Sequence, residues 1–331
     1  MSGFELKHTH APKSKIIFNS LLPDTDEAVK RWLQKKVLWE GMMKSTGDFD
    51  IRHRFLHYNL RFCGIEVQNK IIATNMIKMK RLAGKVSVIT GAGSGMGKAM
   101  ALLFAEEGAA VVVADVNQQA IEQVVSDITA KGQRAKGVVA NVAIQEDIDR
   151  MISTAVSEFG SLDVLVNNAG ILDNFKTVGE LEDELWNRIM DVNLTGPFKT
   201  SRAAIRIMEK QESGGVIINN ASVGGLFGSR GGGAYVASKH GLIGLTRNMA
   251  ATYGLYGNIR VNAIAPGGVD TSIQSSITAP SELGMKALND TGFAPLGKPE
   301  QLAYVALFLA SDESSFVNGE VIAADGGWTA R

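Results

Sequence analysis

Short apolar runs alternate with longer amphipathic segments along the chain from Lys85 onward. The apolar runs are rich in Val, Ile and Ala, and they span residues 85–90, 109–115, 135–142, 162–170, 215–222, 258–268 and 319–327. Runs of this kind are typical of strands that are covered on both faces, as in a parallel sheet. The segments between them are long enough for crossover helices, so the pattern predicts a doubly wound α/β fold of about seven parallel strands.

Residues 1–78 follow a different pattern, and the domain boundary is predicted near Met79. One amphipathic helix is predicted over 22–39, and residues 56–62 alternate like a strand. The segment carries 13 Lys/Arg against 8 Asp/Glu, whereas glycine is concentrated after it. We expect a small or partly disordered N-terminal extension, preferably explained as upstream sequence included by a misplaced start, with an appended module as the alternative.

Two patterns in residues 1–78 resemble binding sites, one for nucleic acid and one for a metal, but a structural explanation is preferred for each. Basic and aromatic residues interleave over 52–62, which occurs in nucleic-acid-binding surfaces, but a half-buried strand with a charged face is preferred. His53 and His57 are four residues apart, yet no cysteine or carboxylate cluster completes a metal site. We therefore expect neither a nucleic-acid partner nor a bound metal.

The overall composition excludes several classes of protein. The formal net charge is zero and 45% of residues are hydrophobic, as in ordinary globular proteins. Cys63 is the single cysteine, so no intrachain disulfide can form, which fits a reducing, cytoplasmic setting. No apolar run approaches the roughly 20 residues of a membrane helix, and the N-terminus lacks the apolar core of a signal peptide. A membrane partner is not expected.

A glycine-rich loop, TGAGSGMG at 90–97, joins the first predicted strand to the first predicted helix. Gly91, Gly95 and Gly97 allow backbone amides to approach a pyrophosphate at the helix N-terminus, which indicates a Rossmann-type dinucleotide site. Asp115 closes the second strand 24 residues after Gly91. A carboxylate there accepts hydrogen bonds from ribose hydroxyls and repels a 2′-phosphate, so NAD is the expected cofactor. The alternative role for Asp115 is an N-cap of the next helix.

Tyr235 and Lys239 are four residues apart in AYVASKHG and share one face of a predicted helix. An ammonium beside a phenol favours the phenolate, so the pair suits proton transfer, although such pairs also occur by chance on helix surfaces. Ser222 ends the fifth predicted strand 13 residues before Tyr235, and Asn193 lies in DVNLTGPF between the fourth and fifth strands. Taken alone, Ser222 is explained as a turn cap, Asn193 as a structural amide and Lys239 as solvated surface.

Taken in order, these motifs resemble the short-chain dehydrogenase/reductase family over residues 79–331, in the branch with a TGxxxGxG loop and a YxxxK pair. The resemblance implies that Tyr235 is the general acid/base that exchanges a proton with the substrate oxygen. It implies that Lys239 lowers the pKa of Tyr235 and holds the nicotinamide ribose. It further implies that Ser222 hydrogen-bonds the substrate oxygen and that Asn193 holds a water linking Lys239 to solvent.

The same resemblance implies the cofactor contacts and the assembly. A homotetramer is expected, built partly from the helices that bear Asn193 and Tyr235 and partly from the C-terminal strand. The phosphate loop, the ends of the second, third and fourth strands and the segment after the sixth strand are expected to hold NAD. The expected contacts are Gly91, Ser94, Gly95, Met96, Gly97, Asp115, Asn141, Val142, Asn168, Ala169, Gly170, Tyr235, Lys239, Pro266, Val269 and Thr271.

The substrate is expected to be a neutral secondary alcohol or ketone, between which and nicotinamide a hydride is transferred. A lid is predicted over about 270–295, with few charges, and Phe227 and Phe293 are candidate apolar walls. Residues 228–233 are rich in glycine and predict an open approach, with Arg230 as a candidate anion contact. The alternatives are a 3-oxoacyl-(acyl-carrier-protein) reductase, a role that usually uses NADPH, and a non-catalytic NAD(H)-binding regulatory protein.

Overall fold

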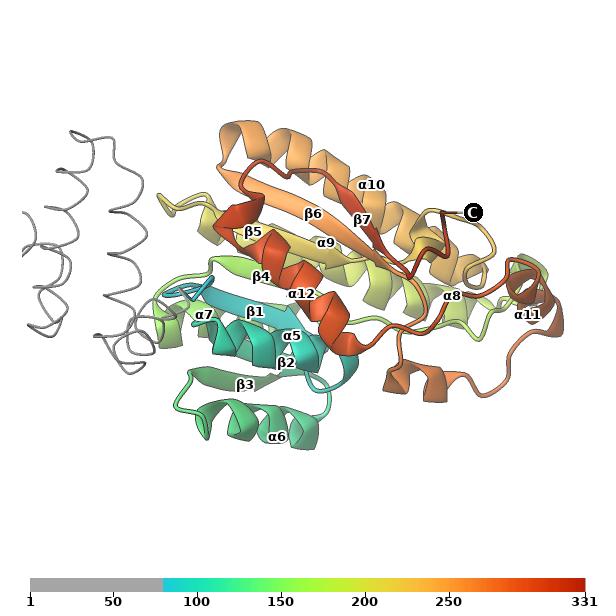
Figure 1. The fold of residues 1–331 in the computed structure, drawn as a ribbon, viewed down its shortest axis with the longest axis horizontal. Coiled ribbons are helices and arrows are strands. Elements are labelled where there is room, and N and C mark those ends of the chain that lie inside the picture. Colours follow the sequence, from blue (N-terminus) through green and yellow to red (C-terminus); the bar gives the residue numbers. More distant parts are fainter. Residues whose placement is uncertain (1–79, 331) are drawn as a thin grey trace, which may run out of the picture. The chain divides into compact units, whose positions relative to one another are not determined.

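The computed structural model describes residues 80–330. A seven-stranded sheet with the strand order β3-β2-β1-β4-β5-β6-β7 runs through this part of the chain. All of its paired strands are parallel, and helices lie on both sides of it (Figure 1). The predicted doubly wound α/β fold is therefore confirmed. The helix, the strand and the domain boundary predicted for residues 1–79 lie outside the described residues.

Each apolar run in the sequence contains one strand, but the strands are shorter than the runs. The strands are β1 (Val86–Thr90), β2 (Ala110–Asp115), β3 (Ala135–Val139), β4 (Val164–Asn167), β5 (Gly215–Asn220), β6 (Ile259–Pro266) and β7 (Val321–Ala324). The trailing residues of several runs leave the hydrogen-bonded ladder and form loops at the carboxyl edge of the sheet. These loops are the expected place for a ligand in such a sheet.

Helices connect the strands, and short 3-10 or π turns complete the loops. The α-helices are α5 (Gly95–Glu106), α6 (Gln118–Thr129), α7 (Gln145–Phe159), α8 (Asp183–Met190), α9 (Gly196–Met208), α10 (Gly233–Tyr256), α11 (Glu282–Asn289) and α12 (Pro299–Ala310). The turns are η1 (Val178–Glu180), η2 (Asp191–Thr195), η3 (Val223–Gly225), η4 (Ser272–Ser276) and η5 (Asp312–Ser314). Helices α8 and α11 lie at the end toward which the strands point (Figure 1).

The sheet separates two hydrophobic cores. One core packs β1 and β2 side chains such as Ile89 and Val113 against α5, α6 and α12. The other packs Val88 and Val112 against α7, α9 and α10. Neighbouring residues of a strand thus enter different cores, which explains why the central strands carry apolar residues on both faces. Among the helices of residues 80–330, none is both long enough and apolar enough to cross a membrane.

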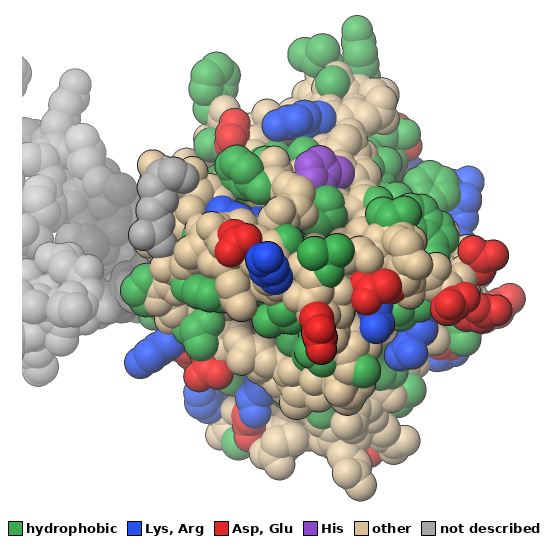
Figure 2. Space-filling view, turned by 90° about the vertical axis from the view of Figure 1, so that its right-hand side faces the viewer, with side chains coloured by type: hydrophobic (Ala, Val, Ile, Leu, Met, Phe, Trp, Pro, Cys, Tyr) green, Lys and Arg blue, Asp and Glu red, His purple; other side chains and the backbone are tan. Residues whose placement is uncertain are grey.

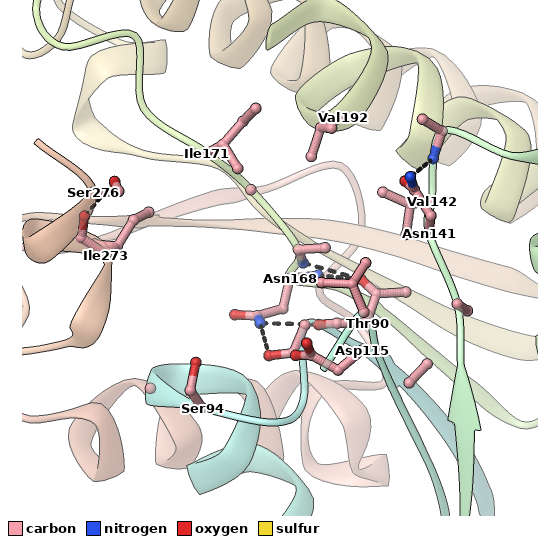
Figure 3. A pocket seen from close by; sticks show the side chains of 18 of the residues that line it. Thr90, Ser94, Asp115, Asn141, Val142, Asn168, Ile171, Val192, Ile273 and Ser276 are labelled. Carbon is pink, nitrogen blue, oxygen red and sulfur yellow. Dashed lines mark hydrogen bonds between the residues drawn. The ribbon is translucent and has the colours of Figure 1, made fainter. Parts of the chain in front are cut away.

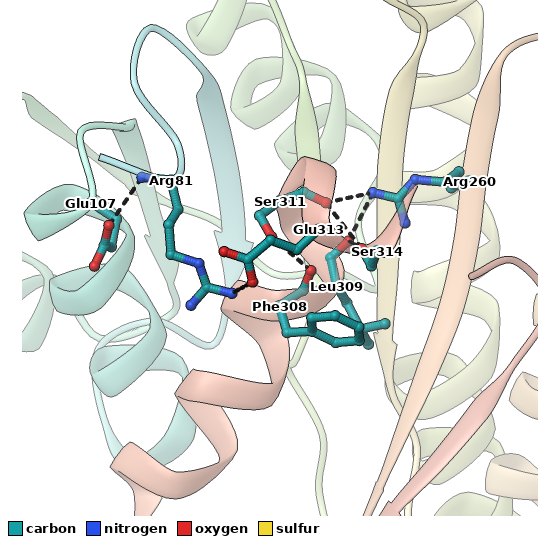
Figure 4. Close-up of polar contacts among 8 residues, drawn as sticks. All are labelled: Arg81, Glu107, Arg260, Phe308, Leu309, Ser311, Glu313 and Ser314. Carbon is teal, nitrogen blue, oxygen red and sulfur yellow. Dashed lines mark hydrogen bonds and ion pairs between the residues drawn. The ribbon is translucent and has the colours of Figure 1, made fainter. Parts of the chain in front are cut away.

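Arg81 and Arg260 connect separate segments of the chain near the amino ends of the strands (Figure 4). The backbone N–H of Arg81 donates to Glu107 Oε2 over 3.0 Å, and its guanidinium pairs with Glu313. Arg260 on β6 donates to the carbonyls of Leu309 and Ser311, each over 3.1 Å. These carbonyls end α12, so a cation there satisfies acceptors that the helix itself leaves unpaired.

Candidate functional site

A cleft of about 840 Å³ opens at the carboxyl edge of the sheet, beside the switch point between β1 and β4. Loops that follow four successive strands of the sheet line it, together with η4. Figure 3 shows Asn141 and Val142 at one end of this cleft, Ile273 and Ser276 at the other, and Asn168 between them. An elongated crevice in this position fits the ligand site of a doubly wound sheet.

Most of the predicted cofactor residues meet in this cleft, although their parent motifs lie far apart in the chain. Predicted residues in its lining are Gly91, Ser94, Gly95, Met96, Asp115, Asn141, Val142, Asn168, Ala169, Gly170 and Thr271. The remaining five lie outside the lining. Three of these are buried: Gly97 in α5, Pro266 at the end of β6, and Val269 beside Gly297. The other two, Tyr235 and Lys239, lie on α10.

The lining also contains residues that the sequence analysis missed. Helix α8 and η2 contribute Glu184, Asn187, Arg188, Asp191 and Val192. Most of these are three or four residues apart, so they share one helix face. Helical spacing was the only signal in the sequence, and it does not distinguish a cleft wall from a solvated surface.

The glycine-rich loop folds closely against α5. Gly91 and Gly95 have φ angles of 62° and 53°, in the left-handed region that favours glycine. A Cβ atom at Gly97 would lie 2.1 Å from the carbonyl oxygen of Gly91, so this position excludes any side chain. The loop therefore brings the first N–H groups of α5 to the cleft, and α5 has no acidic residue in its first turn. Such a helix end fits an anion such as a diphosphate.

Asp115 ends β2 and points to the same loop. Its Oδ2 accepts a 2.9 Å hydrogen bond from the N–H of Gly93, and its Oδ1 accepts one of 3.0 Å from Asn117. Asn117, not Asp115, caps α6 by accepting from the N–H of Ala120, so the alternative role of Asp115 as the N-cap is wrong. Each carboxylate oxygen keeps lone-pair capacity for a further donor, such as a hydroxyl of a bound diol.

Helix α10 presents Tyr235 and Lys239 on one face, next to the end of β5. The Lys239 ammonium lies 5.7 Å from the centre of the Tyr235 ring and donates a 2.8 Å hydrogen bond to the carbonyl of Asn220. Lys239 is buried, and burial lowers its pKa to about 8. It is therefore not the solvated surface lysine that was the alternative.

Ser222 serves two partners. Its Oγ accepts a 3.0 Å hydrogen bond from the N–H of Gly224 and caps η3, as the turn-cap explanation expects. It also hydrogen-bonds the phenol of Tyr235, which lowers the pKa of that phenol. Burial has the larger effect and raises the pKa of Tyr235, with a further rise from the charge of Asp173. The lowering of the Tyr235 pKa that was expected from Lys239 is not among these causes.

Asn193 lies in η2, a π turn between α8 and α9, and its side chain is completely buried. Its Oδ1 accepts from the N–H of Ile171 and its Nδ2 donates to the carbonyl of Ile171, both over 2.9 Å. The structural-amide explanation therefore holds for the side chain. The water-holding role of Asn193 stays a prediction.

Asp173 is a further site residue that the sequence analysis missed. Its carboxylate is 1% exposed and accepts hydrogen bonds from the N–H groups of Gly232 and Tyr235, over 3.1 and 2.8 Å. Gly232 is the N-cap residue of α10 and has no side chain, so Asp173 provides the cap from a distant loop. Burial raises the pKa of Asp173, although its backbone hydrogen bonds act in the opposite direction.

The predicted lid contains η4 and α11, and an aromatic cluster lies beside it. The guanidinium carbon of Arg230 is 4.3 Å from the centre of the Trp328 ring and 5.8 Å from that of Phe227. Phe293 stacks on Trp328 with 6.2 Å between ring centres. The two predicted apolar walls thus join one cluster around Arg230, and Trp328 was missed. Figure 2 shows acidic, basic and hydrophobic side chains intermingled on this face.

Residues 80–330 contain no group of three or more His, Cys, Asp or Glu side chains that could hold a metal ion. The arrangement of the described residues is instead that of a glycine-rich loop beside a partly buried phenol and a buried hydroxyl and ammonium. Such a set can bind a dinucleotide and transfer a proton.

Comparison with known proteins extends this result. A family model described as Enoyl-(Acyl carrier protein) reductase matches residues 91–329. The 3beta-hydroxysteroid dehydrogenase 2 of Eggerthella lenta is 43% identical over 252 residues, which cover 75% of this chain and 96% of that protein. The 3-oxoacyl-[acyl-carrier-protein] reductase FabG of Thermotoga maritima is 42% identical over 248 residues, covering 75% and 98%. A crystal structure of a short-chain type dehydrogenase/reductase from Mycobacterium marinum matches with a TM-score of 0.70 and 34% identity, covering 77% and 99%.

Proposed function

Because the chain belongs to the short-chain dehydrogenase/reductase family, we propose that it transfers a hydride between NAD and a secondary alcohol or ketone. Its named relatives are a dehydrogenase and a reductase, and this chain is an oxidoreductase of the same family. The observation that best supports the proposal is the meeting of Ser222, Tyr235 and Lys239 at the carboxyl end of β5. Ser222 hydrogen-bonds the phenol, and Lys239 bonds the last residue of the strand.

The residues that line the cleft support NAD as the cofactor. The glycine-rich loop and the start of α5 would hold the diphosphate, and Asp115 would accept from the adenosine ribose. Asn141 and Val142 would contact adenine. The segment 168–170 and Lys239 would contact the nicotinamide ribose, and Pro266, Val269 and Thr271 would contact the carboxamide. When bound, NAD supplies a carbon centre that accepts or gives the hydride.

The chain's own residues handle the proton that accompanies the hydride. In alcohol oxidation, the deprotonated phenolate form of Tyr235 accepts the proton of the substrate hydroxyl while the C–H bond breaks. In ketone reduction, the same oxygen donates its proton to the carbonyl oxygen. Ser222 holds the substrate oxygen as negative charge develops on it. Since burial raises the pKa of Tyr235, the protonated, proton-donating form prevails at neutral pH in the protein alone.

An apolar substrate is favoured by the lid. Leu288 and Met285 of the lid belong to a buried hydrophobic cluster with Val223, Trp328 and Phe175. This environment and the hydroxysteroid named for one relative both support a neutral alcohol on an apolar skeleton. The second candidate is 3-oxoacyl thioester reduction, which the FabG relative favours and Asp115 disfavours. A non-catalytic regulatory role is opposed by the complete set of Ser222, Tyr235 and Lys239.

The decisive experiment is a rate comparison across substrate classes. NADH and NADPH oxidation are measured with cyclic ketones, a 3-oxosteroid and a 3-oxoacyl thioester. The proposal expects turnover of ketones with NADH. Turnover of the thioester alone, with NADPH, would establish the second candidate, and no turnover of any of them despite NADH binding would leave the regulatory role.

Asp115→Ala is expected to narrow the preference for NAD over NADP by about 10- to 100-fold, measured as the ratio of the two kcat/KM values. The carboxylate is a negative charge placed where a 2′-phosphate would add two more, and each tenfold change corresponds to about 1.4 kcal/mol. Asp127→Ala on the outer part of α6 is the matched control and should leave the ratio unchanged. A wild-type protein that already prefers NADP would refute this role of Asp115.

Asp173→Asn is expected to move the alkaline rise of kcat/KM for alcohol oxidation to lower pH. The charge of Asp173 raises the pKa of Tyr235, so its removal makes the phenolate easier to form. The variant also loses charge-assisted bonds to the cap of α10, which should cost about 1.5–3 kcal/mol of unfolding free energy. A pH profile that stays in place while the melting temperature falls would reduce Asp173 to a purely structural cap.

The expected homotetramer is tested by light scattering. Helices α9 and α10 leave side chains such as Phe198 and Tyr256 exposed, at 43% and 88%. Apolar exposure on these helices supports an interface between copies of the chain. A tetramer is expected at micromolar concentration, and a monomer there would contradict the proposal. The cytoplasmic location likewise stays a prediction.

A further inference from the structure

Asn220 is the last residue of β5, and it touches three parts of the candidate site at once. Its side-chain Nδ2 donates to Asn168 Oδ1 over 2.9 Å and lies 3.9 Å from the sulfur of Met96 in the phosphate loop. Its backbone carbonyl accepts from Lys239. The residue is 4% exposed, so its carboxamide is almost completely removed from bulk solvent.

The neighbouring hydrogen bonds determine which way the carboxamide of Asn220 faces. The Nδ2 of Asn168 donates to the carbonyls of Thr90 and Gly91, over 2.9 and 3.1 Å, and only an NH₂ group can do so. The oxygen of Asn168 must therefore face Asn220 and accept from it. Asn220 in turn must use its NH₂ group on Asn168, so its own Oδ1 points away from that partner.

The Oδ1 of Asn220 has no hydrogen-bond partner among residues 80–330. An unpaired buried acceptor destabilises the folded state and is rare in folded proteins. The adjacent Asn219 provides a contrast, because its NH₂ donates to Thr246 and its oxygen accepts from Asn167. A buried strand that needed only packing at position 220 would carry an aliphatic residue, like Ile217 and Ile218 before it.

We propose that Asn220 is a further cofactor-binding residue, whose Oδ1 accepts a hydrogen bond from the nicotinamide riboside half of the bound dinucleotide. The inference rests on the proposed function and adds a contact to it. The strand order explains why Asn220 is assigned to the nicotinamide riboside half and not to the adenosine half. Asp115 and Asn141 follow β2 and β3 on one side of the switch point, whereas β5 lies on the other side with Lys239 and Tyr235.

Two donors of that half are suitable in chemistry, the ribose hydroxyls and the NH₂ of the nicotinamide carboxamide. Three probes distinguish them by calorimetry. ADP lacks the whole half, ADP-ribose carries the ribose alone, and NADH carries both groups. The dissociation constant of each is measured for the wild-type protein and for Asn220→Leu, which keeps the approximate volume but removes the acceptor.

Asn220→Leu is expected to weaken NADH binding about tenfold and to leave ADP binding unchanged. ADP-ribose weakened to the same degree identifies a ribose hydroxyl, and ADP-ribose unchanged identifies the carboxamide; either result supports the proposal. Unchanged NADH binding would overturn the proposal, because Asn220 Oδ1 would then accept its hydrogen bond from a water molecule and not from the cofactor. Equal weakening of all three probes would also overturn it, since Asn220 would then act through the shape of the phosphate loop.

A second variant keeps the test valid if leucine prevents folding. Asn220→Ala also removes the acceptor and introduces no bulk, and its NADH-to-ADP comparison should show the same selective loss. A wild-type protein that binds ADP but not NADH would contradict this inference and the proposed function together. If the wild-type protein binds NADH and both variants bind NADH as tightly as it does, this inference alone is contradicted.

Discussion

Tyr235→Phe is expected to lower kcat about 10³-fold while NADH binds within a factor of two of the wild type, as measured by steady-state kinetics and fluorescence titration. The change removes the oxygen that exchanges the proton, and a positioned acid/base typically contributes 10²- to 10⁴-fold. The phenylalanine ring keeps the space of the tyrosine ring. That space is confined, since a Cβ at Gly231 would lie 2.5 Å from it.

The matched control is Tyr304→Phe, whose side chain is 60% exposed. Its helix, α12, packs in the hydrophobic core on the other side of the sheet from the core that contains α10 residues. This variant should keep the wild-type rate. If Tyr235→Phe and the wild type reduce ketones at equal rates, another group moves the proton, and the proposed mechanism is wrong.

Gly97→Ala is expected to weaken NADH binding at least 100-fold and to destabilise the protein by about 1–3 kcal/mol, which corresponds to a fall of several degrees in the melting temperature. The new Cβ would lie 2.1 Å from the Gly91 carbonyl oxygen and 2.5 Å from Asn168 Nδ2. Since the first of these is backbone, the loop must move away from α5. The N–H groups offered to the diphosphate move with it.

Gly179→Ala serves as the control for the glycine substitution. Gly179 lies in η1, and a Cβ there meets no atom within 4 Å. The NADH binding constant and the melting temperature of Gly179→Ala should match those of the wild type. Wild-type NADH affinity in Gly97→Ala would show that the close packing of the loop on α5 is not needed for the cofactor.

The fold and the cleft were predictable because their signals are local. A short apolar run that ends at Asp115 or Asn167 identifies a buried strand and the polar residue at its end. Parallel strands bring those ends to one edge, so residues as distant as Gly91 and Thr271 were placed in one cleft. The positions of the glycines followed from the same reasoning.

The contacts that were missed join residues distant in sequence and carry no periodic signal. Asp173 caps a helix whose N-cap residue, Gly232, lies 59 residues later, and nothing in the spacing points to that pairing. Trp328 reaches Arg230 from the far end of the chain. Both become visible only when the loops at the carboxyl edge are folded together.

The prediction for the pKa of Tyr235 went in the wrong direction for a related reason. Spacing of four on a helix correctly places Lys239 near the ring, but it says nothing of burial or of competing acceptors. In the structure the Asn220 carbonyl takes the ammonium, and burial of the phenol outweighs the hydrogen bond from Ser222. Spacing along a helix thus predicts that two groups lie close together, but it does not predict the burial that shifts the pKa of either group.

The segment that follows β4 has a consequence for engineering the enzyme. Asn168 at its start bonds the glycine-rich loop, and Asp173, five residues on, bonds the N–H of Tyr235. One inserted or deleted residue between them would shift Tyr235 relative to the glycine-rich loop. A chimera that borrows this segment from a relative therefore has to preserve its length, whereas a graft confined to α11 leaves that spacing intact.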